Sequence, residues 1–304
     1  MPKTKENHNT KCGFIAIVGA PNVGKSTLLN RLVGVKVSIV SQKVQTTRTR
    51  ILGICVRGKA QLVFIDTPGI FQPRQRLERA MVAAAWMGAR DADHIALMVD
   101  ATLGLDSNTN SILERFKKEG IHADLILNKV DLVEKLKLLK LAARLNDWDV
   151  FDKTFMISAK KGDGINDLML HFTEKLPSGP WMFPKDQVSN LTDRLIAAEI
   201  TREKIFQQLY KELPYSTTVE TEKWKILEDT SIRIDQVIYI QRDSQKAIIL
   251  GKKGNQIKSI GVEARAELER IFDCHVQLFL FVKVRENWRD DPERYREWGL
   301  DFNA

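Results

Sequence analysis

Gly19-Ala20-Pro21-Asn22-Val23-Gly24-Lys25-Ser26 decides the fold of the first half of this chain. The stretch fits the GxxxxGK[ST] pattern, in which backbone N–H groups surround the phosphates of a nucleoside triphosphate. The apolar residues 14–18 predict the buried strand before such a loop, and residues 25–32 predict the helix after it. We expect Lys25 to reach the β- and γ-phosphates and Ser26 to bring its hydroxyl to Mg²⁺; Thr27 completes the phosphate-binding set.

Composition and charge indicate a globular protein of two domains. Of the 304 residues, 43% are hydrophobic and 28% charged, which is ordinary for a folded chain. The three cysteines are far apart and contain no CxxC pair, so we expect neither a disulfide framework nor a zinc site, and a reducing, cytoplasmic compartment. No apolar stretch approaches the roughly 20 residues that span a bilayer, and residues 1–11 lack the apolar core of a secretory signal. The net charge of +8 indicates either a polyanionic partner or a solvated basic surface.

Alternating strand-like and helical runs predict the fold class of the first domain. A mostly parallel sheet with helices on both faces is the arrangement that this rhythm favours, which is the α/β class. The turn at residues 57–60 is short enough to make an antiparallel hairpin, which places one reversed strand at the sheet edge. The expected strands are residues 14–19, 51–57, 61–66, 94–100, 123–128 and 154–158.

Asp66-Thr67-Pro68-Gly69 ends the second strand of that hairpin, so a carboxylate is expected beside the phosphate loop. Asp66 can hold Mg²⁺ through water or through Ser26, and the Gly69 N–H can approach the γ-phosphate. The same four residues also form an ordinary turn, but their position after a phosphate loop and a strand favours the nucleotide site. Ile70 follows in the same loop and is included in it.

Asn128-Lys129-Val130-Asp131 follows an apolar strand and predicts which base is bound. The Asp131 carboxylate can accept hydrogen bonds from the N1–H and the 2-amino group of guanine, a donor pair that adenine lacks. Asn128 and Lys129 would brace the base and the loops. Ser158 and Ala159, in the next loop, add a weaker signal for a backbone contact to the guanine oxygen. The sequence therefore predicts GTP and GDP as ligands.

These motifs, in this order, resemble the translation-factor-related class of P-loop GTPases. The resemblance implies a threonine between the first helix and the hairpin that closes on Mg²⁺ and the γ-phosphate, and either Thr46 or Thr47 can fill this role. Ras-like members place a water-orienting glutamine directly after Asp-x-x-Gly, whereas this chain has Ile70 and then Phe71. We therefore expect slow unassisted hydrolysis. Asn22 is similar to an asparagine that coordinates K⁺ in several GTPases lacking that glutamine, or it can simply hydrogen-bond its own loop.

A second domain is expected after a linker rich in proline and polar residues. Residues 177–180 read Pro-Ser-Gly-Pro, and we divide the chain into a GTPase domain (residues 1–178), a linker (179–190) and a C-terminal domain (191–304). Thr192 predicts the N-cap of an amphipathic helix that ends before Pro214. Its apolar residues lie roughly on one face, which we expect to be buried: Leu195, Ile196, Ile200, Ile205, Phe206 and Leu209. Strands at residues 216–225 and 231–241 follow, and residues 275–284 predict a final strand.

Gly251-Lys252-Lys253-Gly254 lies between these strands, and helices are expected at residues 255–260 and 262–272. A Gly-x-x-Gly turn joined to helices lets the backbone lie against nucleotide phosphates, as in KH domains, which clamp about four nucleotides of single-stranded nucleic acid. Alone the tetrapeptide is a weak signal, but its setting predicts a KH domain of the type II, α+β arrangement. Lys258 and Arg265 on the following helix are further candidates for RNA contact. The segment from Asn287 onward is expected either to touch RNA or to cap this domain.

Taken together, the motifs resemble those of the Era family of bacterial ribosome-assembly GTPases along nearly the whole chain. Gly19–Ser26, Gln45–Arg48, Asp66–Gly69, Asn128–Asp131 and Gly251–Gly254 occur in the family's order. The resemblance implies Mg²⁺ as cofactor, binding of the 3′ end of 16S rRNA, and a role in maturation of the 30S subunit, with GTP favouring the RNA-binding state. It also implies a cytoplasmic protein that visits the inner membrane peripherally. Nothing in the sequence indicates more than a monomer.

Three alternatives remain open on the sequence alone. A membrane-associated cell-cycle or signalling GTPase would use RNA binding only secondarily. A metabolic or signalling NTPase would carry the second domain incidentally, which the clamp Gly251–Gly254 disfavours. An RNA-binding scaffold would have a vestigial nucleotide pocket, which the intact Lys25, Ser26, Asp66 and Asp131 disfavour.

Overall fold

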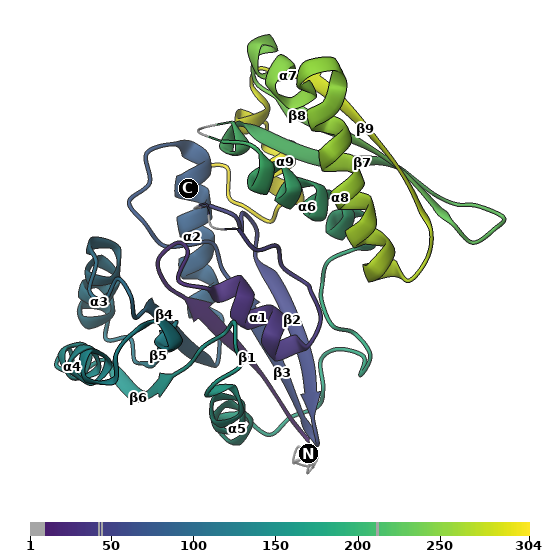
Figure 1. The fold of residues 1–304 in the computed structure, drawn as a ribbon. Helices are drawn as coiled ribbons and strands as arrows, with labels where there is room; N and C mark the ends of the chain where they lie inside the picture. Colours follow the sequence, from purple (N-terminus) through teal and green to yellow (C-terminus); the bar gives the residue numbers. More distant parts are fainter. Residues whose placement is uncertain (1–9, 42, 44, 211–212) are drawn as a thin grey trace, which may run out of the picture. The chain divides into compact units, whose positions relative to one another are not determined.

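The computed structural model describes residues 10–41, 43, 45–210 and 213–304, so most of the N-terminal segment considered above for a signal lies outside it (Figure 1). The chain divides into two compact units. The first contains the described residues up to Ser38, Thr47–Asn190 and Gly299–Ala304, and the second contains Ile39–Thr46 and Leu191–Trp298. This division differs from the predicted ranges at the loop Ile39–Thr46, at residues 179–190, which group with the first unit, and at the end of the chain.

The first unit is built on a six-stranded sheet with the order β2-β3-β1-β4-β5-β6. Only β2 runs antiparallel, pairing with β3 through the predicted hairpin at the sheet edge. The other neighbours are parallel. The predicted α/β class is therefore confirmed. The strands are β1 (Lys11–Val18), β2 (Ile51–Arg57), β3 (Ala60–Asp66), β4 (His94–Asp100), β5 (Ala123–Asn128) and β6 (Phe151–Met156).

Helices cover both faces of this sheet, which explains why its central strands are continuous apolar runs (Figure 1). One face packs against α2 (Arg76–Arg90), α3 (Ser107–Glu119) and α4 (Lys135–Asn146) in a single core cluster. The other face carries α1 (Lys25–Val33) and α5 (Ile165–Lys175). There the Phe172 ring of α5 meets Phe64 of β3 edge to face, 6.0 Å between centroids. The short helix η1 (Val130–Leu132) follows β5.

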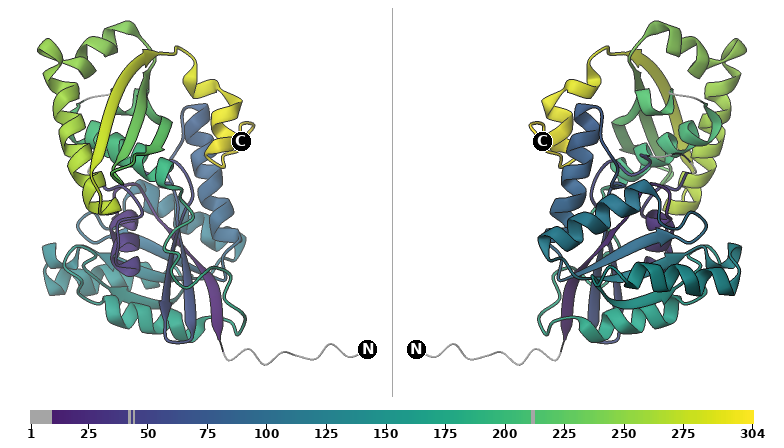
Figure 2. Two further views of the ribbon diagram at one scale, coloured as in Figure 1. Left: turned by 90° about the vertical axis from the view of Figure 1, so that its right-hand side faces the viewer. Right: turned by 90° about the vertical axis from the view of Figure 1, so that its left-hand side faces the viewer.

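The second unit is a three-stranded sheet with helices packed on it (Figure 2). β8 (Ile232–Ile240) pairs antiparallel with β7 (Thr217–Ile226) and parallel with β9 (Val276–Val284). The helices α6 (Asp193–Gln208), α7 (Asp243–Leu250) and α8 (Asn255–Phe272) contribute to its apolar clusters. The predicted α+β arrangement is confirmed. Short helices complete the unit: η2 (Pro214–Ser216), η3 (Lys252–Gly254), η4 (Trp288–Asp290) and α9 (Pro292–Glu297).

Two details of the second unit differ from prediction. The break expected at Gly261 is absent, because residues 255–272 form one helix. A Cβ at Gly261 would lie 3.5 Å from Leu280 Cδ1, so the glycine sits inside a helix that packs against β9. Thr192 caps α6 as predicted, and the helix ends at Gln208, before Pro214 as expected. Leu195, expected on the buried face, is 41% exposed in the first turn of α6.

Residues 287–298 of the C-terminal segment pack on the second unit, and capping is one of the two roles expected for the segment. Trp288 and Tyr295 are fully buried, and the Trp288 indole N–H donates to the Ser216 carbonyl at 3.3 Å. Among the residues that the structure describes, no helix has both the length and the apolar character needed to cross a bilayer. The same residues contain no cluster of three or more histidine, cysteine or carboxylate side chains that would hold a metal.

Candidate nucleotide site and nucleic-acid clamp

The phosphate loop between β1 and α1 depends on two glycines. Gly19 has φ +152° and Gly24 has φ +106°, a backbone region that disfavours other residues. A Cβ at Gly19 would lie 2.3 Å from the Met98 carbonyl oxygen, and one at Gly24 would lie 2.4 Å from the Asn128 amide nitrogen. The loop can therefore close against β4 and β5 only because both positions lack a side chain.

Lys25 is held inside this loop with only 6% of its surface exposed. Its ammonium group donates to the carbonyls of Gly19 at 3.1 Å and Ala20 at 2.9 Å. Burial lowers the pKa of Lys25 to about 8, while the Asp66 carboxylate acts in the opposite direction. A cation at this position is therefore costly in the absence of an anion, which is the condition that a phosphate would relieve.

Asp66 is fully buried at the end of β3 and accepts three hydroxyl hydrogen bonds on one oxygen. Its Oδ2 lies 2.7 Å from the Ser26 hydroxyl, 2.9 Å from that of Ser38 and 3.3 Å from that of Thr47. Burial raises the pKa of Asp66, and Lys25 and the three hydroxyls oppose this. The other oxygen, Oδ1, is buried without a hydrogen-bond partner. A buried carboxylate with one unpartnered oxygen among hydroxyls has the hard oxygen ligands that Mg²⁺ prefers, so the residues present fit this ion.

The hydroxyl groups of the two candidate threonines have different hydrogen-bond partners. Thr47 Oγ1 lies 2.9 Å from the Ser26 hydroxyl, so it belongs to the group around Asp66. Thr46 Oγ1 instead donates to the Lys43 carbonyl at 2.8 Å. The structure therefore brings Ser26, Thr47 and Asp66 together and leaves the Thr46 side chain outside this group.

The loop after β3 contacts the phosphate loop through backbone. The Ile70 N–H donates to the Gly19 carbonyl at 3.0 Å, and a Cβ at Gly69 would lie 2.8 Å from Pro21 Cα. Thr67 is bound elsewhere, because its hydroxyl donates to the Ile17 carbonyl at 2.9 Å. Gly69 thus permits the closest approach of the two loops, and any side chain there would separate them.

The residues expected to bind the base lie at the ends of β5 and β6. Asn128 bridges three segments, because its amide donates to the Val23 carbonyl at 2.7 Å and its oxygen accepts from the Ala159 N–H at 2.9 Å. Lys129 donates to the Asn22 carbonyl at 3.0 Å and to Asp100 at 2.5 Å. A hydrogen bond from the Ser158 side chain and the nearby Lys161 hold the pKa of Asp131 below its ordinary value. Asp131 is therefore an ionised acceptor, as pairing with guanine N1–H and 2-amino groups requires.

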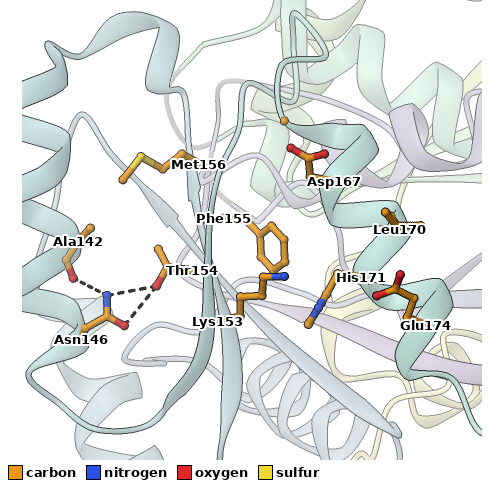
Figure 3. A pocket seen from close by; sticks show the side chains of 11 residues that line it. Ala142, Asn146, Lys153, Thr154, Phe155, Met156, Asp167, Leu170, His171 and Glu174 are labelled. Carbon is orange, nitrogen blue, oxygen red and sulfur yellow. Dashed lines mark hydrogen bonds between the residues drawn. The ribbon is translucent and has the colours of Figure 1, made fainter.

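A separate hollow of ≈ 610 Å³ lies at the edge strand β6, between α4 and α5 (Figure 3). Its lining residues include none of the phosphate loop. His171 there is only 7% exposed, and its Nε2 lies 2.8 Å from Asp124 Oδ2. Asn146 and Thr154 likewise pair with each other at 3.2 Å. These three polar side chains thus have protein partners, and the hollow is distinct from the nucleotide site.

In the second unit, the predicted clamp forms the turn between α7 and α8. Gly251 has φ +70° and Gly254 φ +77°, and Lys253 between them has φ +53°. Lys252 and Lys253 are exposed, and so are Lys258 and Arg265 seven residues apart on α8. Helix positions separated by seven residues share a face, so Lys258 and Arg265 lie on one side of α8, and Lys252 and Lys253 are exposed in the turn before it. Ile248 and Val262, 56% and 49% exposed, add apolar surface on the two flanking helices.

Sequence reasoning missed a row of buried charged side chains on α6. Arg202 is 2% exposed and Glu203 1% exposed, although both positions suggest a solvated helix face. Arg202 donates to the Thr46 carbonyl at 2.5 Å, and Glu203 accepts from the Val40 N–H at 2.7 Å. These contacts explain why Ile39–Thr46 groups with the second unit. The sequence of α6 offered no clear signal for this burial, because charged residues on an amphipathic helix normally face solvent.

Comparisons with known proteins bear on both units. The family model described as "50S ribosome-binding GTPase" matches residues 14–129, and the one described as "KH domain" matches residues 212–289. The GTPase Era of Rhizobium meliloti (strain 1021) is 59% identical over 293 residues, which cover 96% of this chain and 94% of that protein. The GTPase Era of Brucella suis biovar 1 is 55% identical, covering 98% and 96% of the two chains.

Solved structures agree with these relatives. A crystal structure of Era with MgGDPNP and nucleotides 1506–1542 of 16S ribosomal RNA matches with a TM-score of 0.90 and 39% identity, covering 96% of this chain and 99% of that one. A variant of Aquifex aeolicus Era bound to GDP and AlF4⁻ matches with the same TM-score and identity, over 95% of this chain. The resemblance inferred from the motifs is confirmed, and the chain belongs to the Era family of GTPases.

Proposed function

We propose that this chain is a GTP-hydrolysing switch that binds the single-stranded 3′ end of 16S rRNA through its second unit and assists maturation of the 30S subunit. The observation that carries the proposal is the presence of two sites in one chain. One is a phosphate loop closed around Lys25, and the other is the Gly251–Gly254 turn with exposed cations beside it. The RNA target is supported by the related Era structure, which holds nucleotides 1506–1542.

For the cofactor, we propose that Ser26, Thr47 and Asp66 hold Mg²⁺. Support comes from their mutual distances of 2.7–3.3 Å and from the buried, unpartnered Asp66 Oδ1. The bound ion would neutralise charge on the β- and γ-phosphates. We assign the switch role to Thr47 and not to Thr46, whose hydroxyl donates to a local carbonyl. Thr47→Ala should then impair hydrolysis far more than Thr46→Ala, and equal losses would contradict the assignment.

We further propose that hydrolysis is slow and that K⁺ accelerates it through Asn22. Ile70 follows the Asp66–Gly69 motif and is 6% exposed, so no side chain at this position can orient the attacking water. A monovalent cation held by the Asn22 side chain would supply positive charge at the phosphates. The test compares turnover in K⁺ and in Na⁺ at equal ionic strength, with Asn22→Ala as the variant that should abolish the difference. Equal turnover of the unaltered protein in both salts would refute the proposal.

The central test measures affinity for an oligonucleotide that matches the 3′ end of 16S rRNA, in excess non-hydrolysable GTP analogue and again in excess GDP. We expect tighter binding with the analogue by about 5- to 150-fold, the usual range of coupling between two sites. A shuffled oligonucleotide serves as control. Tight binding that is indifferent to nucleotide would keep the RNA target and discard the switch. Weak binding in both states would move the target to another RNA.

We also propose a cytoplasmic monomer that associates peripherally with the membrane, as the family resemblance implies. The net charge of +8 supports attraction to anionic lipid. If RNA affinity proved weak while vesicle binding was strong, the alternative of a membrane-associated cell-cycle or signalling GTPase would be favoured. Flotation of the purified protein with anionic vesicles, measured beside RNA affinity, separates the two.

A further inference from the structure

Helix α4 carries an unusual number of exposed leucines. Leu138 and Leu145 face the core, as an amphipathic surface helix requires. Leu136 and Leu139, however, are 64% and 59% exposed, and Leu132 just before the helix is 69% exposed. Leu136, Leu139 and Ala143 are spaced three and four residues apart, so they form one apolar strip on the solvent side. None of the three leucines lines the hollow beside β6.

Basic side chains accompany this strip on the same helix. Lys135, Lys137, Lys140 and Arg144 are all exposed, and no acidic residue lies within α4. Glu134, at the N-cap, pairs with Lys137 at 3.2 Å, and Asp147 follows at the C-cap. At helical spacing, Lys137, Lys140 and Arg144 lie along one side of the leucines and Lys135 along the other. The solvent face of α4 is therefore apolar in the middle and positive at its margins.

Helix α5 provides an internal comparison. Leu170 there is 55% exposed, nearly as much as Leu139 of α4. Its neighbours one turn away on the same face are Asp167 and Glu174, which are acidic (Figure 3). An exposed leucine is thus not in itself unusual in this protein, and single exposed apolar residues need no explanation. The combination of several leucines with flanking cations occurs on α4.

We propose that the exposed face of α4, defined by Leu132, Leu136, Leu139, Lys137, Lys140 and Arg144, docks on an anionic lipid surface. A helix with an apolar strip bordered by Lys and Arg matches the boundary between lipid headgroups and acyl chains, where apolar side chains insert and cations meet phosphates. The proposal rests on the proposed peripheral membrane association and locates it.

Other partners fit this face less well. A stable protein partner needs roughly 800 Å² on each side, whereas the apolar strip here is narrow and is bordered by cations. Nucleic acid would engage the cations but would leave the leucines without a partner, because single-stranded bases stack on aromatic side chains. Lipid is the partner that uses both parts of the pattern.

The test measures co-sedimentation of the full chain with phosphatidylcholine vesicles, with and without phosphatidylglycerol. Leu136→Gln/Leu139→Gln removes apolar surface at constant charge, and we expect it to weaken binding to the anionic vesicles on the order of tenfold to a hundredfold. Lys137→Gln/Lys140→Gln should weaken it by about fivefold per charge removed. The matched control is Leu170→Gln/Leu195→Gln, two leucines that are also exposed but lie on α5 and α6, which should bind as the unaltered protein does.

The possible outcomes separate this inference from the function on which it rests. Selective loss in the α4 leucine variant supports docking through α4. Equal binding of the α4 and control leucine variants overturns it while leaving membrane association intact. Loss in the lysine variant alone indicates a purely electrostatic surface, which also overturns it. No binding of the unaltered protein to either vesicle refutes both the docking and the peripheral association, while GTP turnover and RNA affinity, measured on the same samples, still decide the switch.

Discussion

The phosphate loop and the Gly251–Gly254 clamp both depend on glycines with positive φ, yet they use charge in opposite ways. Lys25 is 6% exposed and held by two carbonyls, whereas Lys252 and Lys253 extend into solvent. A buried cation acts through fixed geometry and is weakly screened by salt. Exposed cations act through release of counterions, so their contribution falls steeply as salt rises. If both sites bind phosphate, as proposed, we expect them to differ in their sensitivity to salt.

The largest effect is expected from removing the buried cation. Lys25→Ala should weaken binding of GDP and of a non-hydrolysable GTP analogue by about 2–5 kcal/mol, the usual cost of truncating one partner of a desolvated charge pair. Titration calorimetry of the purified proteins measures this directly. Lys252→Ala is the control from the other site and should leave nucleotide affinity unchanged. A loss below tenfold for Lys25→Ala would mean that the loop binds phosphate mainly through its backbone.

Reversing the charge of the two exposed lysines in the clamp tests their contribution to RNA binding. Lys252→Asp/Lys253→Asp should abolish measurable RNA binding and leave GTP affinity intact, because the two lysines belong to the second unit. In the corresponding alanine variant, the slope of log affinity against log salt should flatten by about 0.7 for each RNA phosphate that the protein no longer neutralises. Lys117→Asp/Lys118→Asp, an exposed lysine pair on α3, is matched in charge and should retain RNA binding. Similar losses of RNA affinity in the two double variants would show that the clamp lysines contribute only general electrostatic attraction.

The pH dependence of nucleotide affinity provides a smaller effect that only the buried site should show. Because burial lowers the pKa of Lys25 to about 8, the free protein loses this proton as pH rises above that value. Phosphates beside the ammonium group favour its charged form, so the complex holds more protons than the free protein above pH 8. By linkage, nucleotide affinity is level below this pKa and falls above it, by up to about tenfold per pH unit.

Fluorescence titration with labelled GDP between neutral pH and pH 9 follows this decline. Lys25→Arg is the control, since a guanidinium group keeps its proton throughout this range. Titration of the guanine base would change nucleotide affinity equally in both proteins, so the arginine variant corrects for it. Parallel curves for the two proteins would show that Lys25 does not titrate and that its pKa in the folded protein is ordinary.

Much of the fold followed from local patterns. The strand β1, the phosphate loop and α1 are contiguous, so sequence spacing alone placed Lys25 and Ser26 correctly at the start of a helix. Asp66 lies close to these two residues because β3 runs parallel to β1, with Asp66 in register with Ile17. Asn128 reached the same edge because β5 runs parallel to β4. Short-range motifs were thus sufficient wherever parallel strands end at a common edge.

What escaped prediction depends on interactions between distant segments. Thr46 and Val40 are bound by α6, because Arg202 donates to the Thr46 carbonyl and Glu203 accepts from the Val40 N–H. Those buried charges look like solvent-facing positions when α6 is read as an isolated amphipathic helix. The Ser38 hydroxyl on Asp66 was missed for the same reason, since no motif contains it. The two helices expected on either side of Gly261 are one continuous helix, in which Gly261 lies close to Leu280 of β9.

Two glycines of the second unit provide the smallest effect and the finest comparison. Gly254 has φ +77° with open space around it, so Gly254→Ala should cost about 1–2 kcal/mol of backbone strain without any clash. Gly261 lies within α8, where a Cβ would make an ordinary contact of 3.5 Å with Leu280 Cδ1, so Gly261→Ala should stabilise the helix by about 0.5–1 kcal/mol. Hydrogen exchange of the α8 amides reports both changes locally, without assuming that the two units unfold together.

RNA affinity should fall in the Gly254→Ala variant, because the clamp backbone is displaced, and stay level in the Gly261→Ala variant. Slower exchange after Gly254→Ala would show that the turn does not need its left-handed conformation, and the clamp would then owe its affinity to its lysines alone.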